Sequence, residues 1–245
     1  MERTILLGAL VLAGTAAAQQ PAHLPPGWRV VQPVRWDTPA WSCLNQRLTP
    51  WLVSLDSTGT RLSFASGHEV PSRDSVVFSD GRLVSYDMGE FGGAIHWVSQ
   101  RGDSVQIVEG NPVRLIRRPD TVLVFEGLAH LSLNEGHVLA LTRSGRGWRV
   151  DTLSSLGYAP AVVQAASSST YLVAAAGALL LVHASGRTRV LKANEAWGGL
   201  YPASLVRDRA GVIYVGARGA VFRLREHGNA FAEEWLAPDT ASCFR

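Results

Sequence analysis

The stretch PASLVRDRAGVIYVG, residues 202–216, decides the fold of this chain. It begins with Pro202, at a sharp change of chain direction that we call a corner. Residues 204–207 then form a short apolar run, residues 208–211 a polar turn, and residues 212–215 a second apolar run. Short apolar runs joined by a polar turn that contains glycine are typical of antiparallel strand pairs. The stretch therefore predicts a β-hairpin that starts directly after a corner.

Corners of the same kind recur along the chain after residue 18. Each is a proline, or a histidine among small residues, and an apolar run and a polar turn follow it. Neighbouring corners stand 30 to 46 residues apart, and 41 residues lead from the last corner to Cys243. Units of this length built only from strands are typical of propellers, so we predict an all-β, five-bladed β-propeller. The corners are Pro50, His96, His130, Pro160 and Pro202, and four have a glycine three residues earlier, at Gly93, Gly127, Gly157 and Gly199.

The predicted boundaries of the units follow these corners. The first unit has strands at 51–55, 61–65, 75–79 and 82–86, and the second unit starts at 94–99. Two-residue turns with glycine, of the kind that joins the last two strands of the first unit, are a strong hairpin signal.

Residues 171–182 allow two interpretations. They are rich in Ala and Leu, as a buried helix would be. Gly177 in the middle of the segment and Ser185-Gly186 after it favour a hairpin, and a hairpin is our prediction.

The stretch at residues 202–216 resembles the repeat of bacterial propellers of the NHL, SMP-30-like and two-component-regulator types. The resemblance is good over this unit and looser over the rest of the chain. It implies a propeller fold and no particular activity, because proteins of many functions share the repeat.

The same resemblance raises the question of a metal. Propeller lactonases of the SMP-30-like kind hold Ca²⁺ in the channel with Glu, Asn and Asp, but their ligand positions have no residue-by-residue match here. We therefore predict no cofactor and no metal site, with calcium as the alternative. The candidate ligands for it are His96, Glu126, His130, Asn194, Glu195 and Asp208.

The N-terminus has the pattern of a secretory signal peptide. Arg3 precedes the apolar residues 5–13, and residues 16–18 form an A-x-A cleavage site. The apolar stretch is about half of the roughly 20 residues that a membrane span needs. We expect residues 1–18 to be removed, residues 19–49 to form an arm that covers the ring or adds an edge strand, and residues 50–245 to form the propeller. The mature protein would be secreted or periplasmic, with no membrane span.

Cys43 and Cys243 are the only cysteines, and they stand at the two ends of the five units. Because the first and last blades of a propeller are neighbours, and export favours disulfides, we predict a bond that clasps the ring. Two unpaired thiols are the alternative. The formal charge is only +3 and the basic residues are scattered, so we predict no nucleic-acid partner.

The links between units enter the innermost strands, so they crowd around one end of the axis. We predict that any ligand site lies there, because aromatic rings give broad apolar contact and the histidines give polar orientation. For His96 and His130 the alternative is that they only cap turns. The predicted lining residues are His96, Trp97, Glu126, His130, Tyr158, Trp197 and Tyr201.

No catalytic motif stands out in the chain, which has neither a G-x-S-x-G elbow nor a glycine-rich phosphate loop. The favoured function is therefore an exported, non-catalytic propeller that binds an unknown small molecule or protein. Two alternatives stay open. One is a metal-dependent hydrolase or lyase of the SMP-30-like type, and the other is a structural envelope protein.

Overall fold

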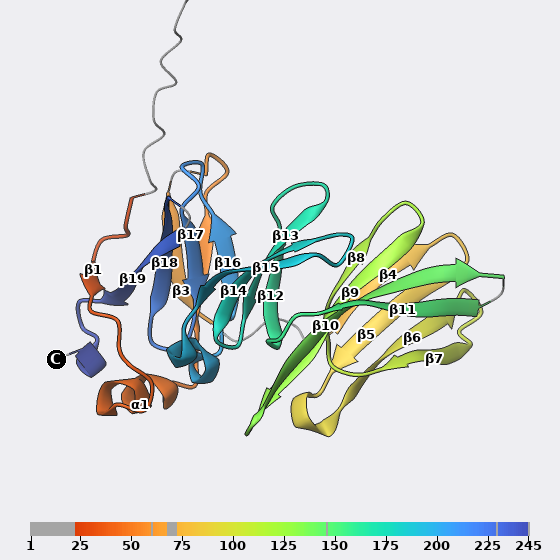
Figure 1. The fold of residues 1–245 in the computed structure, drawn as a ribbon, viewed down its shortest axis with the longest axis horizontal. Coiled ribbons are helices and arrows are strands. Elements are labelled where there is room, and N and C mark those ends of the chain that lie inside the picture. The colour runs from red at the N-terminus through yellow and green to blue at the C-terminus, as the bar shows by residue number, and fades with distance from the viewer. Residues whose placement is uncertain (1–22, 60, 68–72, 146, 229, 245) are drawn as a thin grey trace, which may run out of the picture.

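The computed structural model describes residues 23–59, 61–67, 73–145, 147–228 and 230–244. The predicted signal peptide lies outside these residues. The described chain is almost entirely β, with one α-helix and three short 3₁₀ helices among its strands (Figure 1). The all-β prediction is therefore confirmed.

The described strands form antiparallel sheets whose order follows the chain. The first sheet pairs β2 (Trp51–Leu55) with β3 (Leu62–Ser66). The second sheet consists of β4 (Arg73–Phe78), β5 (Gly81–Asp87), β6 (Gly93–Ser99) and β7 (Ser104–Glu109). The third consists of β8 (Pro112–Arg117), β9 (Thr121–His130), β10 (Leu133–Ser144) and β11 (Gly147–Ser155).

Two further sheets complete the chain. The fourth sheet consists of β12 (Pro160–Ala165), β13 (Thr170–Ala175), β14 (Ala178–His183) and β15 (Thr188–Ala193). The fifth consists of β16 (Ser204–Arg207), β17 (Ile213–Gly216), β18 (Val221–His227) and β19 (Ala230–Pro238), and β1 (Trp28–Val31) pairs with its outer edge. The helices are α1 (Pro39–Asn45), η1 (Gly89–Phe91), η2 (Glu195–Leu200) and η3 (Ser242–Phe244).

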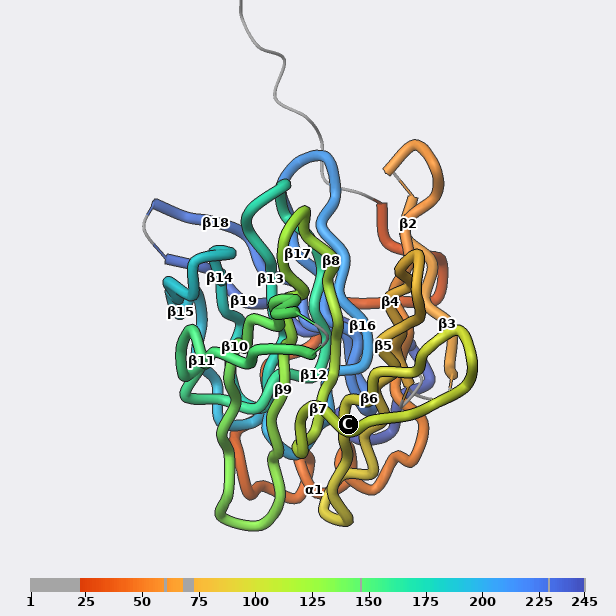
Figure 2. Tube along the Cα trace, turned by 90° about the vertical axis from the view of Figure 1, so that its right-hand side faces the viewer, coloured from red at the N-terminus to blue at the C-terminus, as the bar shows by residue number. Residues whose placement is uncertain are grey.

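The sheets are arranged as in a propeller. Each four-stranded sheet is a meander, and its first strand lies next to the first strand of a neighbouring sheet, in the order β4, β8, β12, β16 and β2 (Figures 1 and 2). First strands that gather in this way surround a common axis, while later strands lie farther out. The architecture is therefore propeller-like.

Buried side chains fill the junctions between neighbouring sheets. Leu83 packs with Leu115 between the second and third sheets, and Phe125 with Val173 between the third and fourth. Phe222 anchors the junction of the fourth and fifth sheets. A fourth cluster joins the fifth sheet to the first. Among the described residues, no such cluster joins the first sheet to the second, so hydrophobic burial links the sheets in the order second, third, fourth, fifth and first.

The first two unit boundaries differ from those predicted. Strands β4 and β5 belong to the second sheet and not to the first. His96 lies inside β6, and His130 ends β9, so neither stands at a link between sheets. Proline has no N–H to give to a sheet and therefore marks strand starts, as at Pro112 and Pro160. Histidine has no such restriction and occurs anywhere in a strand. For this reason the boundaries predicted from His96 and His130 were wrong.

The hairpin interpretation of residues 171–182 is confirmed. Strands β13 and β14 pair along their length around Gly177, whose φ is 93°. They form the middle of a sheet that is covered on both faces, and their side chains are almost all buried. Burial on both faces explains why this hairpin has the apolar composition of a buried helix.

The N-terminal segment joins the end of the chain in two ways. Strand β1 adds to the fifth sheet, one of the two alternatives that the sequence left open. Cys43 of α1 and Cys243 of η3 form a disulfide across 200 residues, with their Cα atoms 5.6 Å apart. The disulfide prediction is confirmed. Within the described residues, no helix has the length and apolar character to cross a membrane.

Candidate functional site

Three links between sheets gather at the lower end of the molecule in Figure 1, where α1 also lies. We call this end the link face. Residues 110–111, 156–159 and 194–203 are the links that lead into β8, β12 and β16. Two adjoining hollows open among them.

The first is an axial hollow of about 360 Å³. Pro112, Pro160 and Pro202 stand at the starts of three successive inner strands, and all three line it. The rest of its wall consists mostly of Gly and Ala, so the hollow offers few hydrogen-bonding side chains.

The second is a larger groove of about 760 Å³, which we call the aromatic groove. Trp36 and Trp41 line it from the N-terminal segment, and Tyr158 and Tyr201 from two links. The β9–β10 turn supplies Leu131 and other residues of its outer rim. Ala129, Ala176, Gly198 and Tyr201 line both hollows, so the two are neighbours.

The tryptophan wall is held against η2. The rings of Trp36 and Trp41 lie 4.2 Å apart, and the indole N–H of Trp41 donates to the carbonyl oxygen of Ala196 at 2.9 Å. A Cβ on Gly199 would stand 2.4 Å from the Trp41 ring, so only glycine permits this approach. Trp36 remains 49% exposed and can contact a ligand.

A buried carboxylate fixes the other wall. Glu233 Oε1 accepts hydrogen bonds from the Asn194 amide at 2.8 Å, from the Trp197 indole at 3.0 Å and from the Trp235 indole at 2.6 Å. Lys192 Nζ lies 3.5 Å from the other oxygen, and the Glu233 side chain is only 6% exposed. Asn194 in turn caps η2 by accepting the N–H of Ala196. The position of η2 is therefore set from beneath by charge-assisted hydrogen bonds.

The β9–β10 hairpin is tied near its turn to the fourth sheet and to the link that precedes that sheet. The Asn134 amide donates to the carbonyl oxygen of Ala176, and its own oxygen accepts the N–H of Ala159, both at 2.8 Å. Farther out, His130 Nε2 lies 2.8 Å from a Glu90 oxygen in η1. These contacts hold the rim of the groove to the second and fourth sheets.

The structure brings together only part of the predicted lining set. His130, Tyr158 and Tyr201 line the aromatic groove. Trp197 is fully buried beneath it and stacks on Phe222 with ring centroids 4.7 Å apart.

The other three predicted residues lie away from the groove. His96 contacts Tyr86 and Ser104 within the second sheet. Trp97 packs between the second and third sheets under Arg143. Glu126 pairs with His137 across β9 and β10 at 3.0 Å. These placements follow from the shifted unit boundaries.

Sequence reasoning missed Trp36, Trp41 and the leucines of the β9–β10 turn. The tryptophans stand before the first repeat, where no repeat position could place them. Their only signal was the Trp-rich composition of the segment that precedes the ring.

The candidate metal ligands do not converge. Within the residues that the structure describes, no group of three or more His, Cys, Asp or Glu side chains is placed to hold a metal ion. Asp208, for example, is 6% exposed and bonded within its own turn, at the opposite end of β16 from the link face. The residues present do not fit the calcium site that the propeller resemblance suggested.

Comparison with known proteins gives no family. No family model and no curated protein matches the chain. Similar solved structures include a Bacteroides caccae protein of unknown function, with 13% identity and a TM-score of 0.35 over 76% of this chain and 72% of that one. A catalytically inactive virginiamycin B lyase from Staphylococcus aureus with quinupristin has 9% identity and a TM-score of 0.35 over 88% and 90%. A streptogramin B lyase has 8% identity and a TM-score of 0.33 over 84% and 86%. These likenesses are too weak to assign a family or an activity.

Proposed function

We propose that this protein is an exported five-bladed β-propeller that binds an apolar or aromatic ligand in the aromatic groove, without acting on it chemically. The observation that carries the proposal is a groove of about 760 Å³ with half-exposed aromatic rings on a fixed scaffold. Ligand sites in proteins are commonly clefts of about 300–1,000 Å³, lined by apolar and aromatic side chains with a few polar groups.

The scaffold beneath the groove supports the proposal on energetic grounds. Trp36 and Tyr201 are 49% and 45% exposed, so a ligand that covers them gains about 25 cal/mol for each Å² of apolar surface removed from water. The hydrogen bonds to Glu233 and Ala196 hold the walls before a ligand arrives. A preformed site loses less conformational entropy on binding, which raises affinity.

Export and blade number belong to the same proposal. Residues 1–18 would be the cleaved signal, residues 19–49 the arm, and residues 50–245 the five blades, a number that the five sheets of the described residues support. The Cys43–Cys243 disulfide supports export, because disulfides persist in oxidising compartments such as the periplasm or the medium. Expression with an intact N-terminus, followed by fractionation and mass spectrometry, should find a mature chain that starts at Gln19.

A glycine in the groove allows a sharp test of the ligand site. A Cβ on Gly198 would meet only Trp36, at 4.0 Å, so Gly198→Leu should obstruct the groove beside Trp36 and leave the fold intact. Gly147→Leu is the matched control, because a Cβ there meets only the Ser144 carbonyl, at 3.8 Å, on β11. Aromatic compounds that raise the melting temperature of the wild type should do so for Gly147→Leu and fail for Gly198→Leu.

Two results would count against the proposal. Undiminished binding by Gly198→Leu would move the ligand away from the groove. Conversion of a bound compound to a product would replace a binding protein with an enzyme, so the compound must be recovered unchanged after incubation.

A further inference from the structure

A separate polar hollow lies at the opposite end of the inner strands from the link face. It has a volume of about 340 Å³ and is formed where the β16–β17 turn of the fifth sheet meets β12 of the fourth. In Figures 1 and 2 this turn lies at the upper end of the molecule. The polar side chains in its wall are Gln164, Arg207, Asp208 and Arg209.

Arg207 and Arg209 bring two positive charges to this hollow. Both side chains are exposed, and among the described residues neither guanidinium forms an ion pair or a hydrogen bond with a protein group. Both side chains lie against glycines. A Cβ on Gly211 would stand 3.3 Å from Arg207 Nη2, and a Cβ on Gly59 would stand 3.2 Å from Arg209 Cγ, so Arg209 leans over the β2–β3 turn at the edge of the hollow.

The carboxylate between the two arginines is turned inward. Asp208 is 6% exposed, and it accepts the N–H of Val212 at 2.9 Å and the hydroxyl of Tyr214 at 3.3 Å. Burial and the nearby Asp208 raise the pKa of Tyr214 to about 12, so the hydroxyl keeps its proton and donates at neutral pH. Asp208 therefore forms hydrogen bonds with Val212 and Tyr214, while Arg207 and Arg209 extend on the exposed side of the turn.

Gln164 adds an amide to the same wall. Its carbonyl oxygen is buried without a hydrogen-bond partner among the described residues. Its amide nitrogen can donate a hydrogen bond to an anion. The wall of the hollow thus contains two cationic side chains and one amide.

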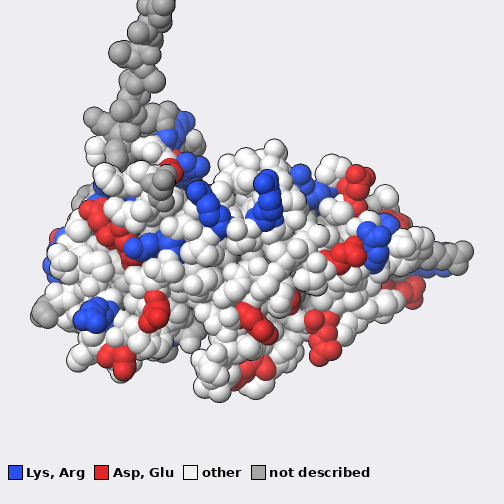
Figure 3. Space-filling model, in the orientation of Figure 1, with Lys and Arg blue, Asp and Glu red and all other residues white. Residues whose placement is uncertain are grey.

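We propose that this hollow binds a small organic anion through a carboxylate or phosphate group. Guanidiniums suit both groups, because each can donate two parallel N–H bonds to two oxygens. A volume of about 340 Å³ exceeds that of a bare ion and suits a molecule the size of a sugar acid or sugar phosphate. Figure 3 shows several Lys and Arg side chains along the upper edge of the molecule, with acidic side chains among them.

The test uses the mature protein and three sugars, namely glucuronate, glucose 6-phosphate and neutral glucose, in titration calorimetry. At least one of the two anions should bind saturably and glucose should not. The double variant Arg207→Gln/Arg209→Gln should weaken that binding by about ten-fold or more, because two charge-assisted contacts are lost. Preference for one anion over the other would identify the group that the hollow recognises.

The chain offers a matched control in Arg187 and Arg189, which are exposed, have the same spacing and stand on the outer strand side of the fourth sheet. Arg187→Gln/Arg189→Gln changes the net charge equally and should leave binding within about two-fold of the wild type. Gln164→Leu should weaken binding without changing the charge. Failure of both anions to bind saturably would overturn the proposal, as would equal weakening by the two arginine pairs. Neither result would bear on the aromatic groove.

Discussion

The guanidinium of Arg218 lies 3.8 Å from the centroid of the Tyr201 ring, and its backbone N–H donates to the carbonyl oxygen of Leu200. Arg218 follows β17, so it connects the fifth sheet to the link that shapes the groove. Tyr201 has φ 49° and ψ 80°, a left-handed conformation that side-chain-bearing residues rarely adopt. Tyr201 lies at the boundary between the two hollows. The cation–π contact with Arg218 thus stabilises Tyr201 although its backbone conformation is unfavourable.

This relationship predicts an unusual order of stability for substitutions at Tyr201. Tyr201→Ala loses the cation–π contact and keeps the backbone strain, whereas Tyr201→Gly loses the contact and relieves the strain. We expect the glycine variant to be more stable than the alanine variant by about 1 kcal/mol, as measured by urea unfolding. The opposite order would mean that the left-handed conformation at Tyr201 costs nothing. Both variants should weaken ligand binding in the groove.

Removing the charge of Glu233 should destabilise the protein far more than removing the charge of an exposed carboxylate. Glu233→Leu leaves three buried N–H donors and Lys192 without their acceptor and should cost about 3–5 kcal/mol. Glu233→Gln keeps one oxygen acceptor and should cost clearly less. Urea unfolding of both variants gives the comparison. Equal losses would show that packing at this site matters and its hydrogen bonds do not.

The disulfide should stabilise the folded protein strongly, because it closes a loop of 200 residues and so lowers the conformational entropy of the unfolded chain. In the chain-entropy model a loop of this size contributes about 5 kcal/mol as an upper value. Cys43→Ala/Cys243→Ala should therefore unfold at markedly lower urea concentration than the wild type. Without reductant, mass spectrometry should find the two cysteine peptides linked. A double variant as stable as the wild type would contradict this role.

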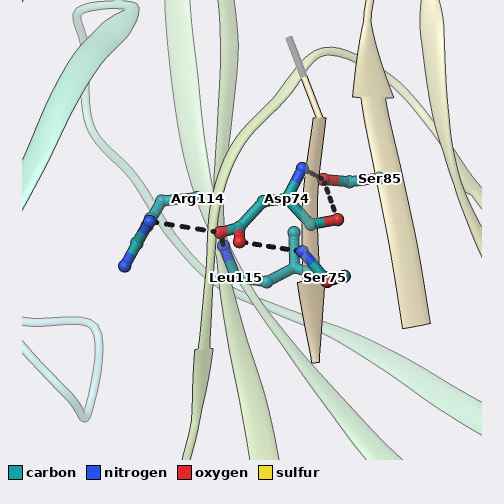
Figure 4. A network of polar contacts seen from close by, with 5 residues as sticks. All are labelled: Asp74, Ser75, Ser85, Arg114 and Leu115. Carbon is teal, nitrogen blue, oxygen red and sulfur yellow. Dashed lines mark hydrogen bonds and ion pairs between the residues drawn. The ribbon is translucent and has the colours of Figure 1, made fainter. Parts of the chain in front are cut away.

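Asp74 connects the first strands of the second and third sheets (Figure 4). Its Oδ2 accepts the N–H of Leu115 at 2.8 Å and lies 3.6 Å from Arg114 Nη1, while Oδ1 accepts the N–H of Ser75. Asp74→Ala should cost about 1.5–3 kcal/mol, since a charged acceptor is removed from a partly buried site. Asp80→Ala is the control, because that carboxylate is 64% exposed and should contribute less than about 1 kcal/mol. Similar losses for the two variants would argue against a special role for Asp74.

The sequence predicted local features better than the assembly of the sheets. Pro160 and Pro202 marked strand starts because proline restricts the backbone wherever it stands. His96 failed as a marker, because a histidine in a strand depends on neighbours that the sequence does not reveal.

The groove was only partly predictable for the same reason. Tyr201 belongs to a link, and links must gather near the axis. Trp36 reaches the groove because the N-terminal segment folds back under the fifth sheet, a long-range event without a local signal. Arg207 and Arg209 carried no signal at all, since an unpaired arginine can be recognised only when its surroundings are known.

The central claim is that the aromatic groove binds the ligand, and the indole resonances of a ¹⁵N-tryptophan-labelled protein test it most directly. Trp36 and Trp41 line the groove, whereas Trp28 packs against Trp51 and Phe64 at the junction of the first and fifth sheets. Titration with a compound that stabilises the protein should shift the Trp36 and Trp41 signals, assigned by Trp36→Phe and Trp41→Phe, and leave Trp28 in place. Saturable binding that shifts neither Trp36 nor Trp41 would contradict the account.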